Sequence, residues 1–211
     1  MTNPTRTLRA LIGAMALFIA SAVSAQSIDS IDWKSGYKWK YKVVDGFTKL
    51  ESGTVEKVVL SVADGVYLTK YFRAAEQYDE SVQPDGSHVR AMPIGAGTFT
   101  YSPVKFPLAE GKKWDSTFFY KTTSNGTLGK TERECKVAGR EKVSSPAGEF
   151  DAYRIECRGY WYANGYSGKQ EDTLWYAPDV KWLVKARYKF WQSGALASHD
   201  EVSLTEYKNA P

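Results

Sequence analysis

Hydrophobic and polar side chains alternate along most of the chain after its first 25 residues. In residues 37–43, aromatic and aliphatic side chains take every second position and lysines take the positions between them. A period of two places the apolar side chains on one face of a β-strand and the lysines on the other. Residues 182–191 repeat this pattern. Outside the first 25 residues no stretch of about 11 residues has a convincing helical period, so helix is expected to be minor.

Tight turns separate the predicted strands. Asp-Gly at 64–65 and Asn-Gly at 125–126 suit the positive φ angles of two-residue hairpin turns, and 83–86 reads as another turn. A final strand is expected over about 200–207. We count about ten strands, and consecutive hairpins favour a single antiparallel up-and-down meander. A sheet this wide must curl or close, so the sequence predicts one strongly curved or barrel-like all-β domain.

The hairpin over residues 53–73 allows a prediction of register. A two-residue turn at 64–65 keeps the apolar side chains of the two strands on one face. The opposed pairs would be Val62 with Tyr67, Leu60 with Thr69, and Val58 with Tyr71.

The first 25 residues predict export. Arg6 and Arg9 precede an apolar run over 10–22, and Val-Ser-Ala at 23–25 is a small-residue cleavage signal. The run is too short for a bilayer span, and no later segment is long enough, so the mature chain is expected to have no transmembrane segment. The residue directly after the cleavage point is Gln26 and not a cysteine, which disfavours lipoprotein processing. We expect a signal peptide over 1–25, one β domain over 26–211, and a soluble periplasmic or extracellular protein.

Composition narrows the class of partner. The chain has 211 residues, with 43% hydrophobic and 25% charged, as in an ordinary globular protein. Its net charge of +4 comes from 28 basic and 24 acidic residues, and loss of two leader arginines leaves 26 against 24, or +2. Export and this small charge disfavour nucleic-acid binding.

The two cysteines are expected to form a structural disulfide in an oxidising compartment. Cys135 and Cys157 lie eleven residues either side of Pro146, within the turn-forming segment 144–148. A hairpin symmetric about Pro146 opposes the two cysteines on adjacent strands, and opposes Val137 to Ile155 on the same face.

Three motifs resemble a bacterial envelope family of unknown function, the TapB-like group. They are Phe-Pro-Leu at 106–108 with Gly-Lys-Lys-Trp at 111–114, VAGREKVSSPAGEFDAYRI at 137–155, and WYAPDVKWLVK at 175–185. Lys181 stands where the pattern would place a glycine, which puts the tightness of that turn in doubt. The resemblance covers about the C-terminal half of the mature chain. It implies an exported, mostly β domain and brings no catalytic residues to carry over.

Motifs for catalysis and metal binding are weak. His88 and His199 lie outside any metal-ligand spacing, and the His-Asp-Glu run at 199–201 reads as a solvated cluster. We therefore predict no metal, no cofactor and no catalytic residues, and lean away from an enzyme. A glycan-active hydrolase with paired carboxylates stays as an alternative. Its candidate residues are Glu132, Glu134, Glu141, Glu156, Glu171 and Asp172.

Two sets of residues suggest binding. The first is an aromatic lining on the predicted inner faces, whose tyrosine hydroxyls would need partners in a dry core. It could hold a ligand as β-barrels do, although a filled core of large residues explains it as well. Its members are Tyr37, Trp39, Tyr41, Tyr67, Tyr71, Trp182, Tyr188 and Phe190.

The second set is an outward basic stripe on two strands, which would form one cationic patch if those strands were neighbours. Separate strands would leave simple solvated faces. The stripe comprises Lys38, Lys40 and Lys42 on one strand, and Lys181, Lys185, Arg187 and Lys189 on the other.

The resulting prediction is a non-catalytic binding or accessory protein of the bacterial envelope. It would hold an amphipathic small molecule or a glycan on a concave aromatic face, with help from lysines at the margin. The alternative is a structural domain with a filled core that contacts another envelope protein.

Overall fold

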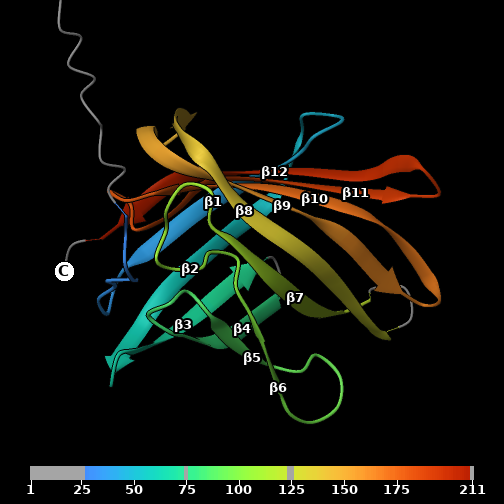
Figure 1. Ribbon diagram of the computed structural model, residues 1–211, viewed down its shortest axis with the longest axis horizontal. Coiled ribbons are helices and arrows are strands. Elements are labelled where there is room, and N and C mark those ends of the chain that lie inside the picture. Colours follow the sequence, from blue (N-terminus) through green and yellow to red (C-terminus); the bar gives the residue numbers. More distant parts are fainter. Residues whose placement is uncertain (1–26, 74–75, 123–125, 210–211) are drawn as a thin grey trace, which may run out of the picture.

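The computed structural model describes residues 27–73, 76–122 and 126–209, so the predicted signal peptide lies outside the described part of the chain. The described residues form twelve antiparallel strands and no helix (Figure 1). Those of the first half are β1 (Lys38–Asp45), β2 (Glu51–Ala63), β3 (Val66–Arg73), β4 (Glu76–Val82), β5 (His88–Ala91) and β6 (Thr98–Tyr101). Those of the second half are β7 (Lys113–Lys121), β8 (Leu128–Ser145), β9 (Gly148–Ala163), β10 (Tyr166–Ala177), β11 (Trp182–Gln192) and β12 (Ala195–Lys208).

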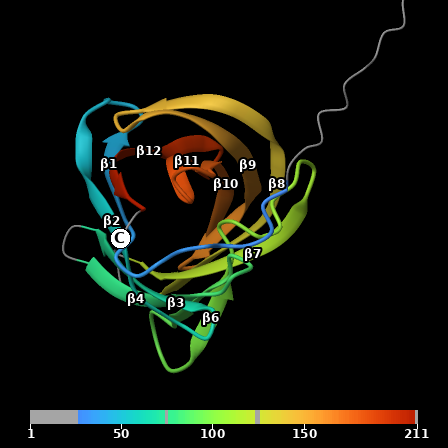
Figure 2. The same ribbon diagram turned by 90° about the vertical axis from the view of Figure 1, so that its left-hand side faces the viewer.

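The strands make one curled sheet in which nearly every neighbour in space is a neighbour in sequence. The order is β6-β5-β4-β3-β2-β1-β12-β11-β10-β9-β8-β7, so the first strand pairs antiparallel with the last. Viewed end-on, the sheet curls into a ring (Figure 2). The predicted all-β, barrel-like meander is therefore confirmed, with twelve strands instead of about ten. The extra strands come from the polar stretch 76–102, whose short strands have little hydrophobic alternation to reveal them.

Side chains bridge the two outermost strands, β6 and β7, which share no strand pairing. The backbone N–H of Ser102, just after β6, donates to Ser116 Oγ of β7 at 3.2 Å. Trp114 Nε1 donates to the Ser102 carbonyl at 2.9 Å. Phe99 of β6 packs edge-on against Phe118 of β7, with ring centroids 5.6 Å apart. These contacts cover sheet edges that would otherwise expose unpaired backbone groups.

One end of the barrel, here called the closed end, is crossed by the segment that precedes β1 (Figure 2). The Ile31 N–H donates to the Pro84 carbonyl at 2.8 Å, and Trp33 Nε1 donates to the Lys181 carbonyl at 2.7 Å. Ile28 pairs with Leu108, which is fully buried. The opposite end, here called the open end, is the one towards which the β9–β10 and β11–β12 hairpins project (Figure 1).

The hairpin of β2 and β3 departs from the predicted register. Val62 faces Tyr67 as expected, but a β-bulge between Val59 and Ser61 then shifts the pairing by one residue. Val59 therefore faces Thr69, and Lys57 faces Tyr71. Because side chains alternate between the two faces of a strand, a one-residue shift exchanges inside and outside. Lys57 consequently points into the barrel, where the sequence pattern had placed Val58.

The hairpin of β8 and β9 has the predicted register at the cysteines. Cys135 faces and is disulfide-bonded to Cys157, and Val137 faces Ile155. Nearer the turn the pairing differs by one residue, since Ser145 faces Gly148. A bulge between Val137 and Gly139 absorbs that difference before the chain reaches the disulfide.

The turn between β10 and β11 is tight although a lysine occupies the expected glycine position. Lys181 has φ of 60°, in the left-handed region, and its N–H donates to the Ala177 carbonyl at 2.9 Å. Its ammonium group forms an ion pair with Asp32 in the segment that crosses the closed end.

Candidate functional site in the barrel interior

The aromatic residues predicted to bind a ligand divide into two groups inside the barrel. Four are buried towards the closed end, and Trp39 among them has no exposed surface. These four are Trp39, Tyr41, Tyr67 and Trp182. Tyr71 and Tyr188 keep some accessible surface. The sequence therefore identified inward-facing aromatic residues correctly, but their accessibility depends on how far along the barrel each one lies.

The buried group packs as a core whose polar tips bond to the backbone. Trp39 Nε1 donates to the Val180 carbonyl at 2.9 Å, and Tyr41 Oη donates to the Leu183 carbonyl at the same distance. Trp33 lies between them and the end of the barrel, with its ring centroid 5.0 Å from that of Trp182. Satisfied donors and close ring contacts are what a filled core requires.

Tyr71, Tyr78 and Tyr188 converge on the interior from β3, β4 and β11. The rings of Tyr71 and Tyr78 stack with centroids 4.8 Å apart. Burial raises the pKa of Tyr71 to about 12. Burial also raises the pKa of Tyr78, and the nearby hydroxyls of Tyr71 and Tyr188 add to that rise. All three side chains nevertheless keep accessible surface. Ligand pockets are lined mainly by apolar and aromatic side chains with a few polar groups, so these three tyrosines are candidates for such a lining.

A buried polar cluster lies beside this wall and was not anticipated from the sequence. The Lys57 ammonium forms an ion pair with Glu80 Oε1, although both side chains are at most 3% exposed. His88 Nδ1 lies 3.1 Å from the same oxygen, and Tyr101 Oη donates to Glu80 Oε2 at 2.7 Å. Lys57 Nζ also lies 5.0 Å from the ring centroid of Trp182. Ionised groups are tolerated at this depth only when they are paired and hydrogen-bonded.

The electrostatics of the cluster favour a charged Lys57–Glu80 pair beside a neutral histidine. Burial alone would raise the pKa of Glu80, but the charge of Lys57 and the hydrogen bonds from Lys57 and His88 hold it well below its usual range. Burial lowers the pKa of His88; the Glu80 charge opposes this shift, and the Lys57 charge reinforces it. His88 Nε2 has no hydrogen-bond partner among the described residues.

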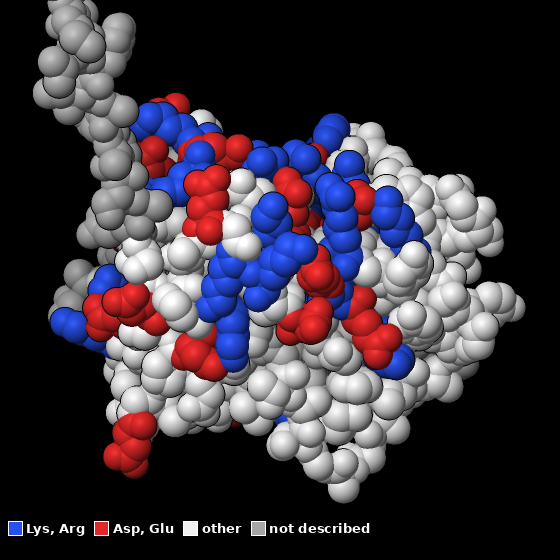
Figure 3. All heavy atoms as spheres, viewed as in Figure 1, with Lys and Arg blue, Asp and Glu red and all other residues white. Residues whose placement is uncertain are grey.

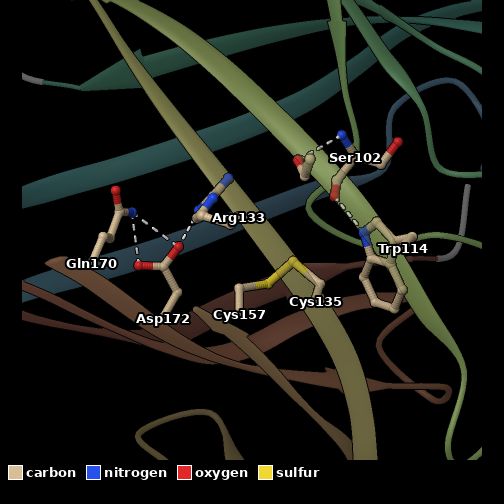
Figure 4. The surroundings of a disulfide bond; sticks show 8 residues. Ser102, Trp114, Arg133, Cys135, Cys157, Gln170 and Asp172 are labelled. Carbon is tan, nitrogen blue, oxygen red and sulfur yellow. Dashed lines mark hydrogen bonds and ion pairs between the residues drawn. A yellow bond between two sulfur atoms is a disulfide. The ribbon is translucent and has the colours of Figure 1, made fainter. Parts of the chain in front are cut away.

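A second polar group faces the interior next to the disulfide (Figure 4). Arg133 of β8 forms an ion pair with Asp172 of β10, and Gln170 Nε2 donates to Asp172 Oδ1 at 2.9 Å. Burial raises the pKa of Asp172, although Arg133 opposes that shift. Within the described chain, three buried atoms here have no hydrogen-bond partner, namely Thr131 Oγ1, Arg133 Nε and Gln170 Oε1. Unpartnered buried polar atoms are costly unless water or a ligand meets them.

The predicted basic residues do not form one patch. β12 lies between β1 and β11 and supplies acidic side chains to the strands on both sides. Lys40 Nζ lies 2.7 Å from Glu206, and Arg187 Nε lies 3.9 Å from Glu201. On the neighbouring β2, Glu56 pairs with Lys38 at 2.8 Å. Acidic and basic groups interleave over the face shown in Figure 3. Of the remaining predicted basic residues, Lys42 lies on β1, and Lys185 and Lys189 lie on β11.

All six candidate carboxylates for hydrolysis lie in ion pairs with basic side chains, and five of these pairs are on the surface. The surface pairs are Glu132 with Lys130, Glu134 with Lys113, Glu141 and Glu156 with Arg154, and Glu171 with Lys169. Asp172 is the one that is fully buried in the interior. Across the described residues there is no group of three or more His, Cys, Asp or Glu side chains that could hold a metal.

The sequence offered only faint signals for the buried clusters. Glu80, His88 and Arg90 fall in the polar stretch where strand boundaries could not be placed, and Lys57 is turned inward by the bulge. A lone histidine within an otherwise charged stretch is the one cue that pointed there.

Three solved structures were found to be similar to this chain. A candidate exported protein with a YmcC-like fold from Bacteroides fragilis has a TM-score of 0.57 and 16% identity, covering 86% of this chain and 99% of its own. A candidate lipoprotein from Parabacteroides distasonis has a TM-score of 0.58 and 13% identity, covering 85% and 99%. The hypothetical lipoprotein YmcC from Escherichia coli has a TM-score of 0.42 and 9% identity, covering 83% and 85%.

The first two of these proteins share the fold of this chain. No protein-family model matches the sequence. No curated protein matches it either. In the described residues there is no helix long and apolar enough to cross a membrane.

Proposed function

We propose that this protein is an exported, non-catalytic binding or accessory protein of the bacterial envelope that holds a small amphipathic ligand at the open end of its barrel. The observation that carries the proposal is the pair of unlike barrel ends. The closed end is a packed aromatic core, whereas the wall towards the open end combines accessible tyrosine rings with charged groups. Apolar surface with a few convergent polar groups is the usual composition of a small-molecule site.

Envelope location is supported by two independent indications. The first 25 residues have the three parts of a signal peptide. The similar proteins from Bacteroides fragilis and Parabacteroides distasonis are described as an exported protein and a lipoprotein. We also propose that the chain is a member of the TapB-like group. The motifs at 106–114, 137–155 and 175–185 support this proposal.

Native mass spectrometry of the protein purified from a bacterial envelope tests ligand capture. We expect a mass above that of the disulfide-bonded chain by one small molecule, lost on denaturation. Tyr188→Ala should lose this adduct because it removes a ring from the accessible wall. The matched control is Tyr166→Ala, which removes an exposed ring at the start of β10 and should keep the adduct. A bare wild-type chain, or an adduct retained by Tyr188→Ala, would contradict the proposal.

A protein-contact role is the second candidate, and one observation favours it. Tyr160, Tyr162 and Tyr166 are 57%, 37% and 67% exposed around the β9–β10 turn. A surface hollow next to them is also lined by Phe119 and Leu128. Clustered exposed aromatic side chains are enriched where proteins meet. A bare chain in the native spectrum would make this role the better explanation. The hydrolase alternative has no comparable observation on the described residues.

A further inference from the structure

Arg90 is a cation of the inner wall without a carboxylate partner among the described residues. It follows His88 by two positions on β5, so both side chains face the interior. Its guanidinium carbon lies 3.3 Å from the ring centroid of Tyr78 and 5.5 Å from that of Phe118. The side chain is only half-buried. Aromatic faces orient a guanidinium group and leave its N–H donors free for an anion.

The other cations named on this wall each have a carboxylate partner. Lys57 pairs with Glu80, and Arg133 pairs with Asp172. At the rim, Arg73 lies 3.9 Å from Asp200. Arg90 is therefore one positive charge in excess on this wall, and its side chain keeps accessible surface.

The surroundings of Arg90 also indicate what the rest of the ligand is like. Phe99 of β6 faces Arg90 across the strand pair, and Phe118 of β7 lies beside it. Tyr71 stacks on the same Tyr78 ring that supports the guanidinium. An anion without an apolar body would leave these rings unused. A neutral glycan would leave the Arg90 charge uncompensated, whereas an amphiphile with one acidic head group satisfies both.

From this arrangement we infer that the ligand of the open end is a monoanionic amphiphile, whose carboxylate head is held by Arg90 while its apolar body lies against the tyrosine and phenylalanine rings. This inference rests on the proposed binding function and adds the chemical class of the ligand. A guanidinium group presents parallel N–H donors that match the two oxygens of a carboxylate.

Fluorescence titration of the full mature chain with dansyl-labelled undecanoic acid and with its methyl ester tests the inference. The two probes share the apolar body and differ in the charge of the head group. We expect the acid to bind about tenfold or more tightly than the ester, because a charge-assisted pair contributes at least that much. Acetate should displace neither probe at concentrations comparable to that of the acid.

Variants then assign the preference to Arg90. Arg90→Gln should weaken binding of the acid to the level of the ester and leave the ester unchanged. Arg90→Lys should keep part of the preference. Arg158→Gln removes the same charge from an exposed arginine, 71% accessible, and should bind both probes like the wild type.

Each outcome distinguishes the inference from the function on which it rests. Equal binding of acid and ester by the wild-type protein overturns recognition of an anion and leaves capture of an amphiphile intact. Binding of neither probe overturns both. The comparison of acid with ester needs no variant, so it holds even if Arg90→Gln does not fold.

Discussion

Lys57 places a charged group next to aromatic side chains inside the barrel. Its side chain is 3% exposed and lies between Glu80 and the rings of Trp33 and Trp182. A lysine at this depth loses its hydration, so burial lowers the pKa of Lys57. The charge and hydrogen bond of Glu80 partly reverse this shift. Each of the two buried charges therefore offsets the desolvation cost of the other, and removal of one would leave the other unpaired.

A double-mutant cycle tests this interdependence. Lys57→Met should lower the free energy of unfolding by about 3 kcal/mol or more, because Glu80 would stay buried without its main counter-charge. Lys57→Met combined with Glu80→Gln should recover part of that loss, since the glutamine is neutral and can still accept from Tyr101. Urea denaturation measures both. Losses that simply add would show that the two residues are not coupled.

His88 predicts acid sensitivity of the folded state. Its folded pKa lies below the ordinary value of 6.5, so the unfolded chain binds a proton more readily. Stability from this group is complete above about pH 7 and declines as the pH falls through 6.5. The low pKa of Glu80 adds a further loss below about pH 4.5, where the unfolded carboxylate takes up its proton.

The measurement is the free energy of unfolding at about pH 7.5 and about pH 5.5 for the wild type and His88→Asn. The wild type should be less stable at the lower pH, and His88→Asn should show a smaller change. His199→Asn is the comparison, because burial lowers the pKa of that histidine too but its side chain is partly exposed, so its contribution should be the smaller one. An equal pH effect in the wild type and in His88→Asn would contradict the assignment.

At the scale of elements, the β8–β9 hairpin is the longest continuous pairing in the barrel. It reaches from Ser145 opposite Gly148 to Lys130 opposite Tyr162. The disulfide lies part-way along it, with both cysteines almost completely buried. It therefore fixes the register of the strand pair at a point far from the turn, on the side where Arg133 and Asp172 meet.

Removal of the disulfide should weaken this hairpin without changing the fold. Cys135→Ala with Cys157→Ala opens a loop of about 23 residues, which the chain-entropy model values at about 3 kcal/mol. Thermal and urea unfolding of the double variant and the oxidised wild type measure the difference. Two free thiols in exported wild-type protein, found by peptide mapping without reductant, would refute the role of a structural link.

At the scale of the whole molecule, the barrel has two unlike ends. The segment before β1 and the loop around Leu108 fill the closed end with apolar side chains. Towards the open end, the wall carries Tyr188, Arg133 and Arg90, which remain partly accessible. Packing at the closed end gives stability, and the proposed binding site lies towards the other end.

Substitutions at the two ends should therefore have opposite signatures. Trp39→Ala should lower stability by about 3–5 kcal/mol, because it leaves a cavity at a site with no exposed surface. Tyr188→Ala should cost much less stability and should abolish ligand capture. Denaturation curves paired with native mass spectra separate the two effects. A folded Trp39→Ala protein that loses the ligand selectively would place the binding site at the closed end instead.

The sequence by itself determined the local connections of this fold. Alternation assigned Trp39 and Trp182 to inner faces, the turn at 64–65 set its hairpin, and the spacing about Pro146 opposed Cys135 to Cys157. Period-two patterning and short turns act over a few residues. They specify which strands are neighbours and which face is buried without knowledge of the rest of the chain.

Tertiary structure alone decided the interior chemistry. Pairing of β1 with β12 joined the two halves of the sheet and set acidic side chains between the two basic strands. The bulge after Val59 turned Lys57 towards Glu80, two residues that are 23 positions apart. Such contacts depend on the pairing of strands that are far apart in the sequence and on one-residue shifts of register. A pattern with a period of two residues carries no record of either event.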